Sequence, residues 1–341
     1  MEKKKVVLIE GDGIGPEISQ SVINILSRAG AKIEWVPAYA GLSALERKYD
    51  DPLPQETIDL IKKEKVALKG PLTTEVGSKA GVAQGFRSIN VRLRKELNLY
   101  ANVRPIKTLP NLETRFPYVD LVVVRENTEG LYIGLEQEIT PGVVTSLKVA
   151  TRPACLRIAE YAFAYATRNH RKKVTAVHKA NIMKLTDGLA LECYREIANQ
   201  YPDIEYEERI VDATAMLMVM NPEKLDVLVM ENLYGDILSD LAAGLIGGLG
   251  LAASANIGVD ASVFEAVHGS APDIAGKGLA NPTALLLSAC QLLQHISQGE
   301  VAKRIEAALF DTFKDKNSLT ADLGGKASTS DFTETVISKL K

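Results

Sequence analysis

The segment Met230-Glu231-Asn232-Leu233-Tyr234-Gly235-Asp236-Ile237-Leu238-Ser239-Asp240-Leu241-Ala242-Ala243-Gly244 joins a predicted strand to a predicted helix. The apolar run Val227–Met230 is typical of a buried parallel strand. The residues that follow place one apolar face at helical spacing: Ile237, Leu238, Leu241, Ala242 and Leu245. A buried strand that runs directly into an amphipathic helix indicates an α/β fold.

Asp236 and Asp240 lie one turn apart on the predicted helix. Like charges at this spacing repel by about 0.2–0.5 kcal/mol. A divalent cation would turn that cost into a gain, because Mg²⁺ prefers oxygen ligands. The alternative is that both acids complement the dipole of the helix N-terminus. For Asp236 alone, the interaction with the helix dipole is the favoured interpretation. For the pair beside a strand end, a metal site is favoured.

The composition is that of an ordinary globular protein, with 341 residues, 46% hydrophobic, 24% charged, and a net charge of −3. The length favours two domains, and the charge gives no reason to expect binding to nucleic acid or a membrane. Three cysteines, Cys155, Cys193 and Cys290, lack metal or redox spacing and are predicted to be reduced core residues. Without a signal peptide or a bilayer-long apolar run, we expect a cytoplasmic protein, with the mitochondrial matrix as the alternative.

A glycine-rich turn, Gly11–Pro16, follows the first predicted strand, Val6–Ile9. Its spacing is G-x-G-x-G-P and not the G-x-G-x-x-G of a Rossmann unit, although Glu34 stands roughly where a ribose-binding acid would. We therefore predict a parallel sheet without a standard dinucleotide site. Further on, Thr73 begins a glycine-rich stretch that ends at Gly85, which suggests either a mobile loop over a site or a plain surface loop.

Arginines mark two predicted strand ends and a helix. Arg104 precedes a proline, Arg125 ends the strand Val122–Val124, and Arg94 lies on a helix. Ligands of open α/β sheets bind outside the carboxyl ends of strands, and a guanidinium group can fork onto a carboxylate. These arginines predict a substrate with several carboxylates.

The helix that carries Arg94 begins near Ser88, a candidate N-cap, and also carries Asn90. These three side chains are expected to share one polar surface near the helix start. Arg87 and Arg92 are expected to form surface salt bridges instead.

The turn Pro141-Gly142 separates two weakly alternating runs, Ile133–Ile139 and Val143–Val149, and predicts a protruding hairpin. Such a hairpin suggests a homodimer. Lys179 follows the strand Val174–Val177 and is a candidate base if desolvation lowers its pKa, with a solvated lysine as the alternative. Asp212 follows a short predicted strand, Glu208–Val211, and is a third candidate metal ligand.

The segment Val263–Gly276 is predicted to be a compact loop whose backbone N–H groups face phosphate. Within it, Asp273 would accept a hydrogen bond from a ribose 2′-hydroxyl and repel a 2′-phosphate. Asn281-Pro282-Thr283 then opens a long apolar helix that extends to Ile296.

Together these features resemble the β-decarboxylating dehydrogenases, the family of isocitrate, isopropylmalate, homoisocitrate and tartrate dehydrogenases. The resemblance covers nearly the whole chain and rests on six segments: Gly11–Pro16, Ser88–Pro105, Arg125–Tyr132, His178–Met183, Asn232–Gly250 and His268–Asn281. Ser88-x-Asn90-x-x-x-Arg94 resembles the NAD-dependent isocitrate dehydrogenase branch, since the isopropylmalate branch has a bulkier apolar surface there. One departure is the Glu75–Phe86 loop, which is longer than in the common bacterial NADP enzymes.

The resemblance implies an α/β fold of the isopropylmalate dehydrogenase type, with two domains around a twisted mixed parallel and antiparallel sheet and no Rossmann module. Residues 1–98 and 253–341 would form the large domain, and its second part would bind NAD. Residues 99–252 would form the small domain, with a dimer hairpin at about 130–150.

The resemblance also implies a role for each site residue. The α- and β-carboxylates of isocitrate would be bound by Arg94, Arg104 and Arg125, and its γ-carboxylate by Ser88 and Asn90. Mg²⁺ or Mn²⁺ would be bound by Asp236 and Asp240, with Asp212 from the partner subunit. Lys179, also from the partner, would help to remove the C2 hydroxyl proton, and Tyr132 would protonate the enol carbon. NAD would be bound by Thr73, Asn181, His268, Gly269, Ser270, Ala271, Pro272, Asp273, Ile274 and Asn281.

Three hypotheses follow. The leading one is an NAD-dependent isocitrate dehydrogenase that acts as a homodimer with shared active sites, or as a higher oligomer. The second is a relative that acts on homoisocitrate, isopropylmalate or tartrate. The third is a non-catalytic regulatory subunit of a hetero-oligomer, against which Lys179, Tyr132, Ser88 and the three acids argue.

Overall fold

The computed structural model describes residues 2–73 and 88–341. The chain divides into two compact units, one comprising residues 1–97, 109–114 and 247–341 and the other residues 98–108 and 115–246. The loop expected between Thr74 and Gly85, the Glu75–Phe86 departure and the predicted surface ion pair of Arg87 lie outside the described residues.

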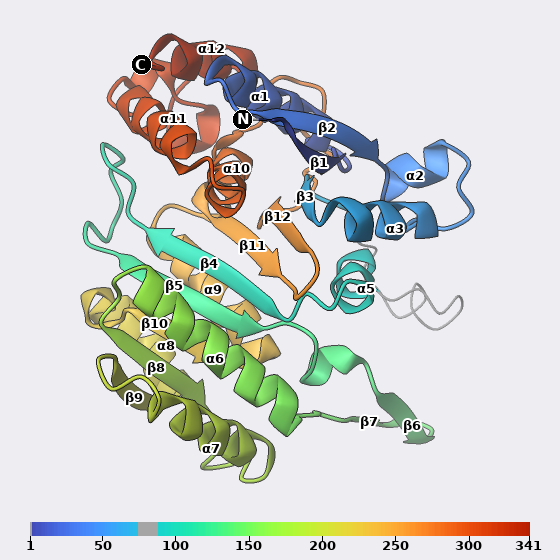
Figure 1. The fold of residues 1–341 in the computed structure, drawn as a ribbon, viewed down its shortest axis with the longest axis vertical. Coiled ribbons are helices and arrows are strands. Elements are labelled where there is room, and N and C mark those ends of the chain that lie inside the picture. The colour runs from blue at the N-terminus through green and yellow to red at the C-terminus, as the bar shows by residue number, and fades with distance from the viewer. Residues whose placement is uncertain (1, 74–87) are drawn as a thin grey trace. The chain divides into compact units, whose positions relative to one another are not determined.

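Among its described residues, the first unit contains five strands in the order β2-β1-β3-β12-β11 (Figure 1). All neighbours are parallel except the antiparallel pair β11 and β12. The strands are β1 (Lys4–Ile9), β2 (Ile33–Ala38), β3 (Val66–Lys69), β11 (Ala253–Ile257) and β12 (Ser262–Ala266). The helices are α1 (Gly15–Arg28), α2 (Leu42–Glu46), α3 (Gln55–Glu64), α5 (Ile89–Glu96), α10 (Thr283–His295), α11 (Gly299–Thr312) and α12 (Thr329–Ser338).

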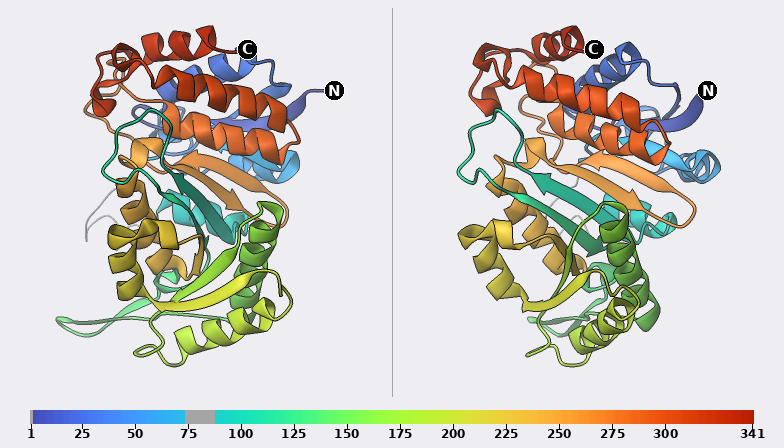
Figure 2. Two further views of the ribbon diagram at one scale, coloured as in Figure 1. Left: turned by 90° about the vertical axis from the view of Figure 1, so that its left-hand side faces the viewer. Right: turned by 60° about the vertical axis from the view of Figure 1, so that its left-hand side comes forward.

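The second unit also contains a five-stranded mixed sheet, in the order β4-β5-β10-β8-β9. Only the β4 and β5 pair is antiparallel. The strands are β4 (Ala101–Lys107), β5 (Asp120–Glu126), β8 (Lys173–His178), β9 (Glu205–Ile210) and β10 (Val227–Met230). The helices are α6 (Arg152–Arg168), α7 (Thr186–Ala198), α8 (Val211–Met220) and α9 (Asn232–Leu245). Figure 2 shows α6 and α7 on one face of this sheet and α8 and α9 on the other.

Two apolar runs of the sequence become the centre of the sheet of the second unit. Val122–Val124 in β5 and Val227–Met230 in β10 are fully buried, as expected for parallel strands covered on both faces. The prediction of a mixed sheet is therefore confirmed, and the strand order of the first unit differs from that of a Rossmann module. The cysteines Cys155, Cys193 and Cys290 are buried and unpaired, also as predicted.

A separate hairpin extends from the second unit. It consists of β6 (Glu136–Thr140) and β7 (Val143–Ser146), which pair antiparallel, and all the residues of both strands are exposed. The hairpin was predicted from the turn residues Pro141-Gly142. Gly142 has a φ of +80°, a conformation that glycine adopts without strain.

Two predicted boundaries were wrong. Val263–Ala266 is part of β12 and not of a loop, because its residues pair with both β3 and β11. The strand expected at Glu208–Val211 begins earlier, as β9, and Val211 already starts α8. Asp212 therefore lies in the first turn of a helix. In the described part of the chain, no helix is long and apolar enough to cross a membrane.

Candidate active site

Helix α9 starts where β10 ends, and Glu231 holds its first turn. The Glu231 carboxylate accepts hydrogen bonds from the backbone N–H groups of Leu233 and Tyr234 at 3.2 and 3.1 Å, so it caps the helix and complements its dipole. A Cβ on Gly235 would lie 2.6 Å from the Cβ of Arg125. Only glycine at this position lets the strand-end arginine pass against the first turn of the helix.

Arg125, at the carboxyl end of β5, is fully buried beside α9. Its Nε and Nη2 donate to Oδ1 of Asn232 at 3.0 and 2.7 Å, and its Nη1 forms an ion pair with Asp236. The hydroxyl of Tyr132 donates to the other oxygen of Asp236. Burial and this hydrogen bond raise the pKa of Tyr132 above its ordinary value, so the phenol keeps its proton at neutral pH.

Arg104, from β4, reaches the next turn of the same helix. Its Nη1 donates to Ser239 Oγ at 2.7 Å and to Asp240 Oδ1 at 2.9 Å. The side chains of Arg104 and Arg125 are 6% and 0% exposed, whereas those of Asp236 and Asp240 are 38% and 53% exposed. The positive charges of this cluster are therefore buried, and its carboxylates face outward.

The apolar face of α9 is narrower than the sequence predicted. Leu238, Ala242 and Leu245 are buried, but Ile237 is 58% exposed. Ser239 takes a buried position instead, because its hydroxyl is bonded by Arg104. The prediction of one continuous apolar face was wrong at Ile237.

Lys179 and Asp212 form a second cluster in the same unit. Lys179 Nζ lies 2.7 Å from Asp212 Oδ1, and the lysine holds the pKa of this carboxyl below its ordinary value. Across residues 2–73 and 88–341, no three His, Cys, Asp or Glu side chains lie together as a metal site would require. One copy of the chain therefore presents Asp236 with Asp240 and Lys179 with Asp212 as two separate pairs.

In the first unit, Arg94 belongs to a buried charge cluster. Its guanidinium lies 3.6 Å from the carboxylate of Glu265, which pairs with Lys69 at 2.8 Å and accepts from Asn256 at 2.6 Å. Burial alone would raise the pKa of Glu265, but the charges of Lys69 and Arg94 lower it to about 2. Glu265 is thus a fixed anion that orients Arg94.

Ser88 and Asn90 lie together at the start of α5, where Ser88 takes the N-cap position as predicted. The Ser88 side chain makes no capping hydrogen bond. The Oδ1 of Asn90 is buried and lacks a hydrogen-bond partner among the residues that the structure describes. Two polar side chains near one helix start are therefore available to a ligand.

The segment His268–Ile274 is fixed to the glycine-rich turn after β1. The N–H of Ile14 donates to the carbonyl of Ser270 at 2.9 Å, and Thr73 Oγ1 donates to Ser270 Oγ at 3.0 Å. The buried carboxylate of Asp12 accepts the N–H of Thr73 at 2.8 Å. Thr73 and this segment, which were both predicted to bind the cofactor, are therefore in direct contact.

Within this segment the side chains differ in exposure. His268 is partly buried, and burial lowers its pKa, so the imidazole is neutral at pH 7. Its Nε2 is buried and unpartnered within the described ranges. Asp273 is exposed in the turn that follows. The arrangement offers a neutral ring and a solvent-facing carboxylate to a nucleotide.

Asn281 and Asn181 differ in how firmly they are held. Asn281 is buried; its Oδ1 accepts from the N–H of Thr283 at 3.0 Å and its Nδ2 donates to Asp322 at 2.9 Å. Asn181 is exposed, in the second unit, two residues after Lys179. The Asn281 side chain thus orders the start of α10, while that of Asn181 is free to turn in solvent.

Residues 5–336 match the family model for isocitrate/isopropylmalate dehydrogenase. The chain belongs to this family. It is 53% identical to a probable isocitrate dehydrogenase [NAD] subunit alpha, mitochondrial, from Drosophila melanogaster, over 99% of this chain and 88% of that one. It is also 53% identical to a chloroplastic 3-isopropylmalate dehydrogenase from Solanum tuberosum, over 90% and 85%. The crystal structure of isocitrate dehydrogenase from Methylococcus capsulatus superposes with a TM-score of 0.93 at 51% identity, covering 100% and 99% of the two chains.

Several residues that shape the site were not predicted from the sequence. Lys69 and Glu265 each stand among apolar residues of a strand, which is the signal of a buried ion pair. Asp12 stands between two glycines, where a carboxylate commonly accepts backbone N–H groups. Asn232 directly precedes the quoted apolar helix face, but its bond to Arg125 depends on a strand distant in sequence.

The residues on α9 fit the divalent cation that this family uses. Asp236 and Asp240 provide outward-facing carboxylate oxygens, the donors that Mg²⁺ and Mn²⁺ prefer. The buried arginines fix both carboxylates in place. Two carboxylates leave several positions of a six-coordinate cation open to other oxygen ligands.

Proposed function

We propose that this chain catalyses the oxidative decarboxylation of isocitrate to 2-oxoglutarate and CO₂ with reduction of NAD⁺. The observation that supports this most is the cluster of Arg104, Arg125, Tyr132, Asp236 and Asp240 around α9, which joins carboxylate-binding groups, a protonated phenol and metal-ligand oxygens. Production of NADH from isocitrate by the purified chain, only when Mg²⁺ or Mn²⁺ is added, is the test. No NADH under these conditions would overturn the proposal.

The proposed substrate contacts come from guanidinium and polar groups. Arg94, Arg104 and Arg125 bind the α- and β-carboxylates, and each is pre-oriented by a protein carboxylate. Ser88 and Asn90 bind the γ-carboxylate. The Nδ2 of Asn90 would donate to this carboxylate, while its Oδ1 is a buried acceptor without a partner among the described residues.

The proposed chemistry uses two proton-transfer groups of this chain. Lys179 would accept the C2 hydroxyl proton, and NAD⁺, when bound, would accept the hydride from C2. Asp236, Asp240 and Asp212 would hold Mg²⁺ or Mn²⁺, and such a cation would polarise the C2 oxygen and stabilise the negative charge that develops on it. Tyr132 then donates its proton to the enol carbon. Its raised pKa suits a group that must arrive protonated.

The nearest alternative is a family member that acts on isopropylmalate, homoisocitrate or tartrate. The Solanum tuberosum relative is as similar in sequence as the Drosophila one, so overall identity does not separate the two substrates. The polar pair Ser88 and Asn90 favours isocitrate, because an apolar isopropyl group would leave both unpaired. A kcat/KM for isopropylmalate that exceeds the one for isocitrate would decide for the alternative.

The regulatory-subunit alternative requires a chain that binds effectors without turnover. Lys179, Tyr132 and the three acids Asp212, Asp236 and Asp240 argue against it, because a subunit without chemistry has no need of them. Turnover by the purified chain alone separates the two hypotheses. Activity that appears only after a second, different chain is added would favour the regulatory one.

The proposed NAD site consists of Thr73, Asn181, Asn281 and His268–Ile274. The exposed carboxylate of Asp273 would accept from the ribose 2′-hydroxyl and repel a 2′-phosphate, so NAD⁺ is expected to be preferred over NADP⁺ by about a hundredfold in kcat/KM. Asp273→Asn should narrow that ratio. Equal use of NADP⁺ by the unchanged chain would be inconsistent with this assignment.

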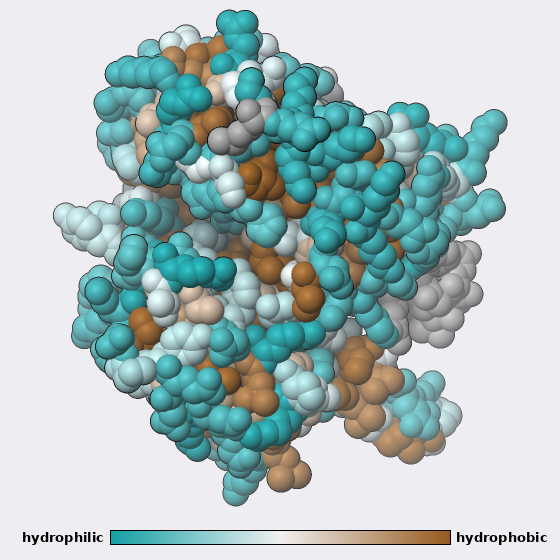
Figure 3. All heavy atoms as spheres, viewed as in Figure 1, coloured by the Kyte–Doolittle hydropathy of each residue, from teal (hydrophilic) through white to brown (hydrophobic). Residues whose placement is uncertain are grey.

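We also propose a homodimer whose two active sites are shared. Exposed apolar side chains on three elements support it: Ile139, Val143 and Val144 on the hairpin, Met216, Val219 and Met220 on α8, and Ile237 on α9. Figure 3 shows hydrophobic side chains gathered on the hairpin. Because Lys179 and Asp212 are paired, they would reach the partner's site together.

Site-sharing is tested by complementation. Lys179→Ala and Asp236→Ala should each be inactive alone, and an equal mixture should regain about a quarter of the wild-type activity, because half of the dimers would contain one intact site. Mixed dimers that form but remain inactive would show that each chain completes its own site.

For the location, we propose the cytoplasm, with the mitochondrial matrix as the alternative, since the Drosophila relative is named mitochondrial. The absence of a membrane-spanning helix among the described residues fits both compartments. Cell fractionation followed by detection of the chain distinguishes them.

A further inference from the structure

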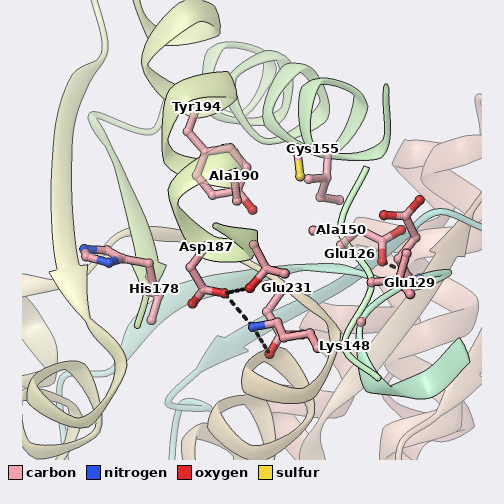
Figure 4. A pocket seen from close by; sticks show the side chains of 15 residues that line it. Glu126, Glu129, Lys148, Ala150, Cys155, His178, Asp187, Ala190, Tyr194 and Glu231 are labelled. Carbon is pink, nitrogen blue, oxygen red and sulfur yellow. Dashed lines mark hydrogen bonds and ion pairs between the residues drawn. The ribbon is translucent and has the colours of Figure 1, made fainter. Parts of the chain in front are cut away.

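Lys148, two residues after the end of β7, is a largely buried cation between two carboxylates. Its Nζ lies 2.6 Å from Asp187 Oδ1 and 3.8 Å from Glu231 Oε1, and Figure 4 shows these three side chains together. The same Nζ lies 4.4 Å from the ring centroid of Tyr234. Burial works to lower the pKa of Lys148, but the two carboxylates offset this and raise it above its ordinary value. The side chain is therefore charged and fixed.

The first partner, Asp187, holds the backbone of the proposed base. Its Oδ2 accepts the N–H of Lys179 at 2.7 Å, while Oδ1 binds Lys148. The carbonyl of Lys179 accepts the N–H groups of Ile182 and Met183 at 2.9 and 2.8 Å, which closes a turn after β8. Asp187 is buried, so the position of the Lys179 backbone depends on a carboxylate with little freedom to move.

The second partner, Glu231, holds the helix of the proposed metal ligands. It caps α9 through the N–H groups of Leu233 and Tyr234. Its Oε2 also lies where a Cβ on Gly130 would approach to 2.8 Å, so the backbone ahead of Tyr132 packs directly against it. A substitution of Glu231 would therefore alter both the start of α9 and the backbone near Tyr132, the proposed general acid.

We propose that Lys148 is a positioning residue that couples the turn bearing Lys179 to the capped start of α9. The inference rests on the proposed function, since it assigns Lys148 a role toward Lys179 and the α9 carboxylates. Without the ammonium, Asp187 and Glu231 would be two facing, poorly compensated carboxylates at a partly buried site. Their repulsion would displace the Lys179 turn, and small displacements of catalytic groups reduce turnover more than substrate binding.

The experiment compares Lys148→Met, Lys148→Arg and a matched control, Lys173→Met. Lys173 lies at the other end of β8 and pairs with Glu207 at 3.5 Å in a similarly half-buried setting. Lys148→Met is expected to lower kcat for isocitrate about tenfold or more, with KM changed less than about threefold. Lys148→Arg should recover most of kcat, and Lys173→Met should leave kcat unchanged.

Hydrogen exchange of the backbone amides at 179–183 provides a readout independent of turnover. Lys148→Met should exchange faster there, and Lys173→Met should match the wild type. An unchanged kcat and unchanged exchange in a folded Lys148→Met protein overturn the proposal. If Lys148→Met does not fold, Lys148→Gln replaces it, because the amide can still donate a hydrogen bond to Asp187 but lacks the positive charge, and the same two effects are expected.

Failure of this inference and failure of the proposed function give different results. A wild-type chain that makes no NADH from isocitrate would defeat the proposed function. The exchange comparison would still decide whether Lys148 orders the turn at Lys179. A wild-type chain that is active, with Lys148→Met equally active and equally protected, would defeat the inference alone.

Discussion

The two units each contain a cluster of arginine and carboxylate side chains, and the clusters differ in how far their carboxylates are buried. In the first unit, the carboxylate of Glu265 and the ammonium of Lys69 are both sealed, with side chains 9% and 2% exposed. In the second unit, Arg104 and Arg125 are sealed, whereas Asp236 and Asp240 open to solvent. The carboxylates are therefore sealed in the first cluster and reach solvent in the second.

The difference suggests that the sealed cluster stabilises the fold and that the open cluster binds ligands. A sealed carboxylate surrounded by cations cannot exchange its partners, so Glu265 serves to orient Arg94. Open carboxylates backed by fixed arginines keep lone pairs available for a cation. Changes at the sealed cluster should therefore appear mainly as lost stability, and changes at the open cluster as lost activity.

The largest effect is expected from the open cluster. Asp240→Asn and Asp236→Asn should each lower kcat/KM for isocitrate by about a hundredfold or more, because a ligand of the proposed cation loses its charge. Initial rates at several Mg²⁺ concentrations measure this. Glu192→Gln, which changes an exposed acid on α7, is the control and should leave the rate unchanged. Full activity of both asparagine variants would remove the distinction between the clusters.

The next effect is on stability and comes from the sealed cluster. The pKa of Glu265 is lowered from 4.5 to about 2, which corresponds to about 3 kcal/mol of folding free energy at neutral pH. Because the folded pKa is the lower one, this contribution is complete above pH 4.5 and is lost as the pH falls through 2. Urea unfolding of Glu265→Gln should show the loss at pH 7 and a smaller difference from wild type near pH 3.

The urea experiment also has an outcome that contradicts the comparison. Equal unfolding free energies for wild type and Glu265→Gln at pH 7 would mean that the sealed cluster does not anchor the fold. Asp240→Asn, measured in parallel, should lose less stability, because its carboxylate is already largely solvated.

A smaller effect is expected on metal affinity. With two acids of α9 as the open cluster, the proposed cation needs further oxygens, which the substrate would supply. Calorimetry should find Mg²⁺ or Mn²⁺ bound about tenfold more tightly when isocitrate is present, and isocitrate equally favoured by the metal, as linkage requires. Identical metal affinities with and without isocitrate would count against this arrangement.

The smallest effect is expected at Arg92, which was predicted to form a surface salt bridge. That prediction is confirmed, since Arg92 Nη1 lies 2.6 Å from Asp51 Oδ2 with both side chains about one third exposed. Arg92→Gln should cost less than about 1 kcal/mol and leave the kinetics unchanged. Arg94→Gln, two residues away, should raise KM for isocitrate instead. Equal kinetic losses in both variants would show that the cluster around Glu265 gives Arg94 no special role.

The sequence by itself determined the elements that depend on local pattern. The apolar runs predicted β5 and β10, the Pro141-Gly142 turn predicted the hairpin, and the helical spacing of Asp236 and Asp240 placed both acids on one helix. Six motif segments in the right order, among them Ser88–Pro105, also led to the family, and family membership is confirmed. Each of these patterns depends on residues close together in the sequence, so a single stretch of the chain is enough to predict the element.

Only the tertiary structure decided which charges are partners. Arg125 meets Asn232 and Asp236 more than a hundred residues later in the chain, and Lys69 meets Glu265 across two paired strands. Ile237 belongs to the predicted apolar face but is exposed, whereas Ser239 is buried and accepts a hydrogen bond from Arg104. Burial and the free energy of an ion pair depend on what lies around each group, and no local pattern carries that information.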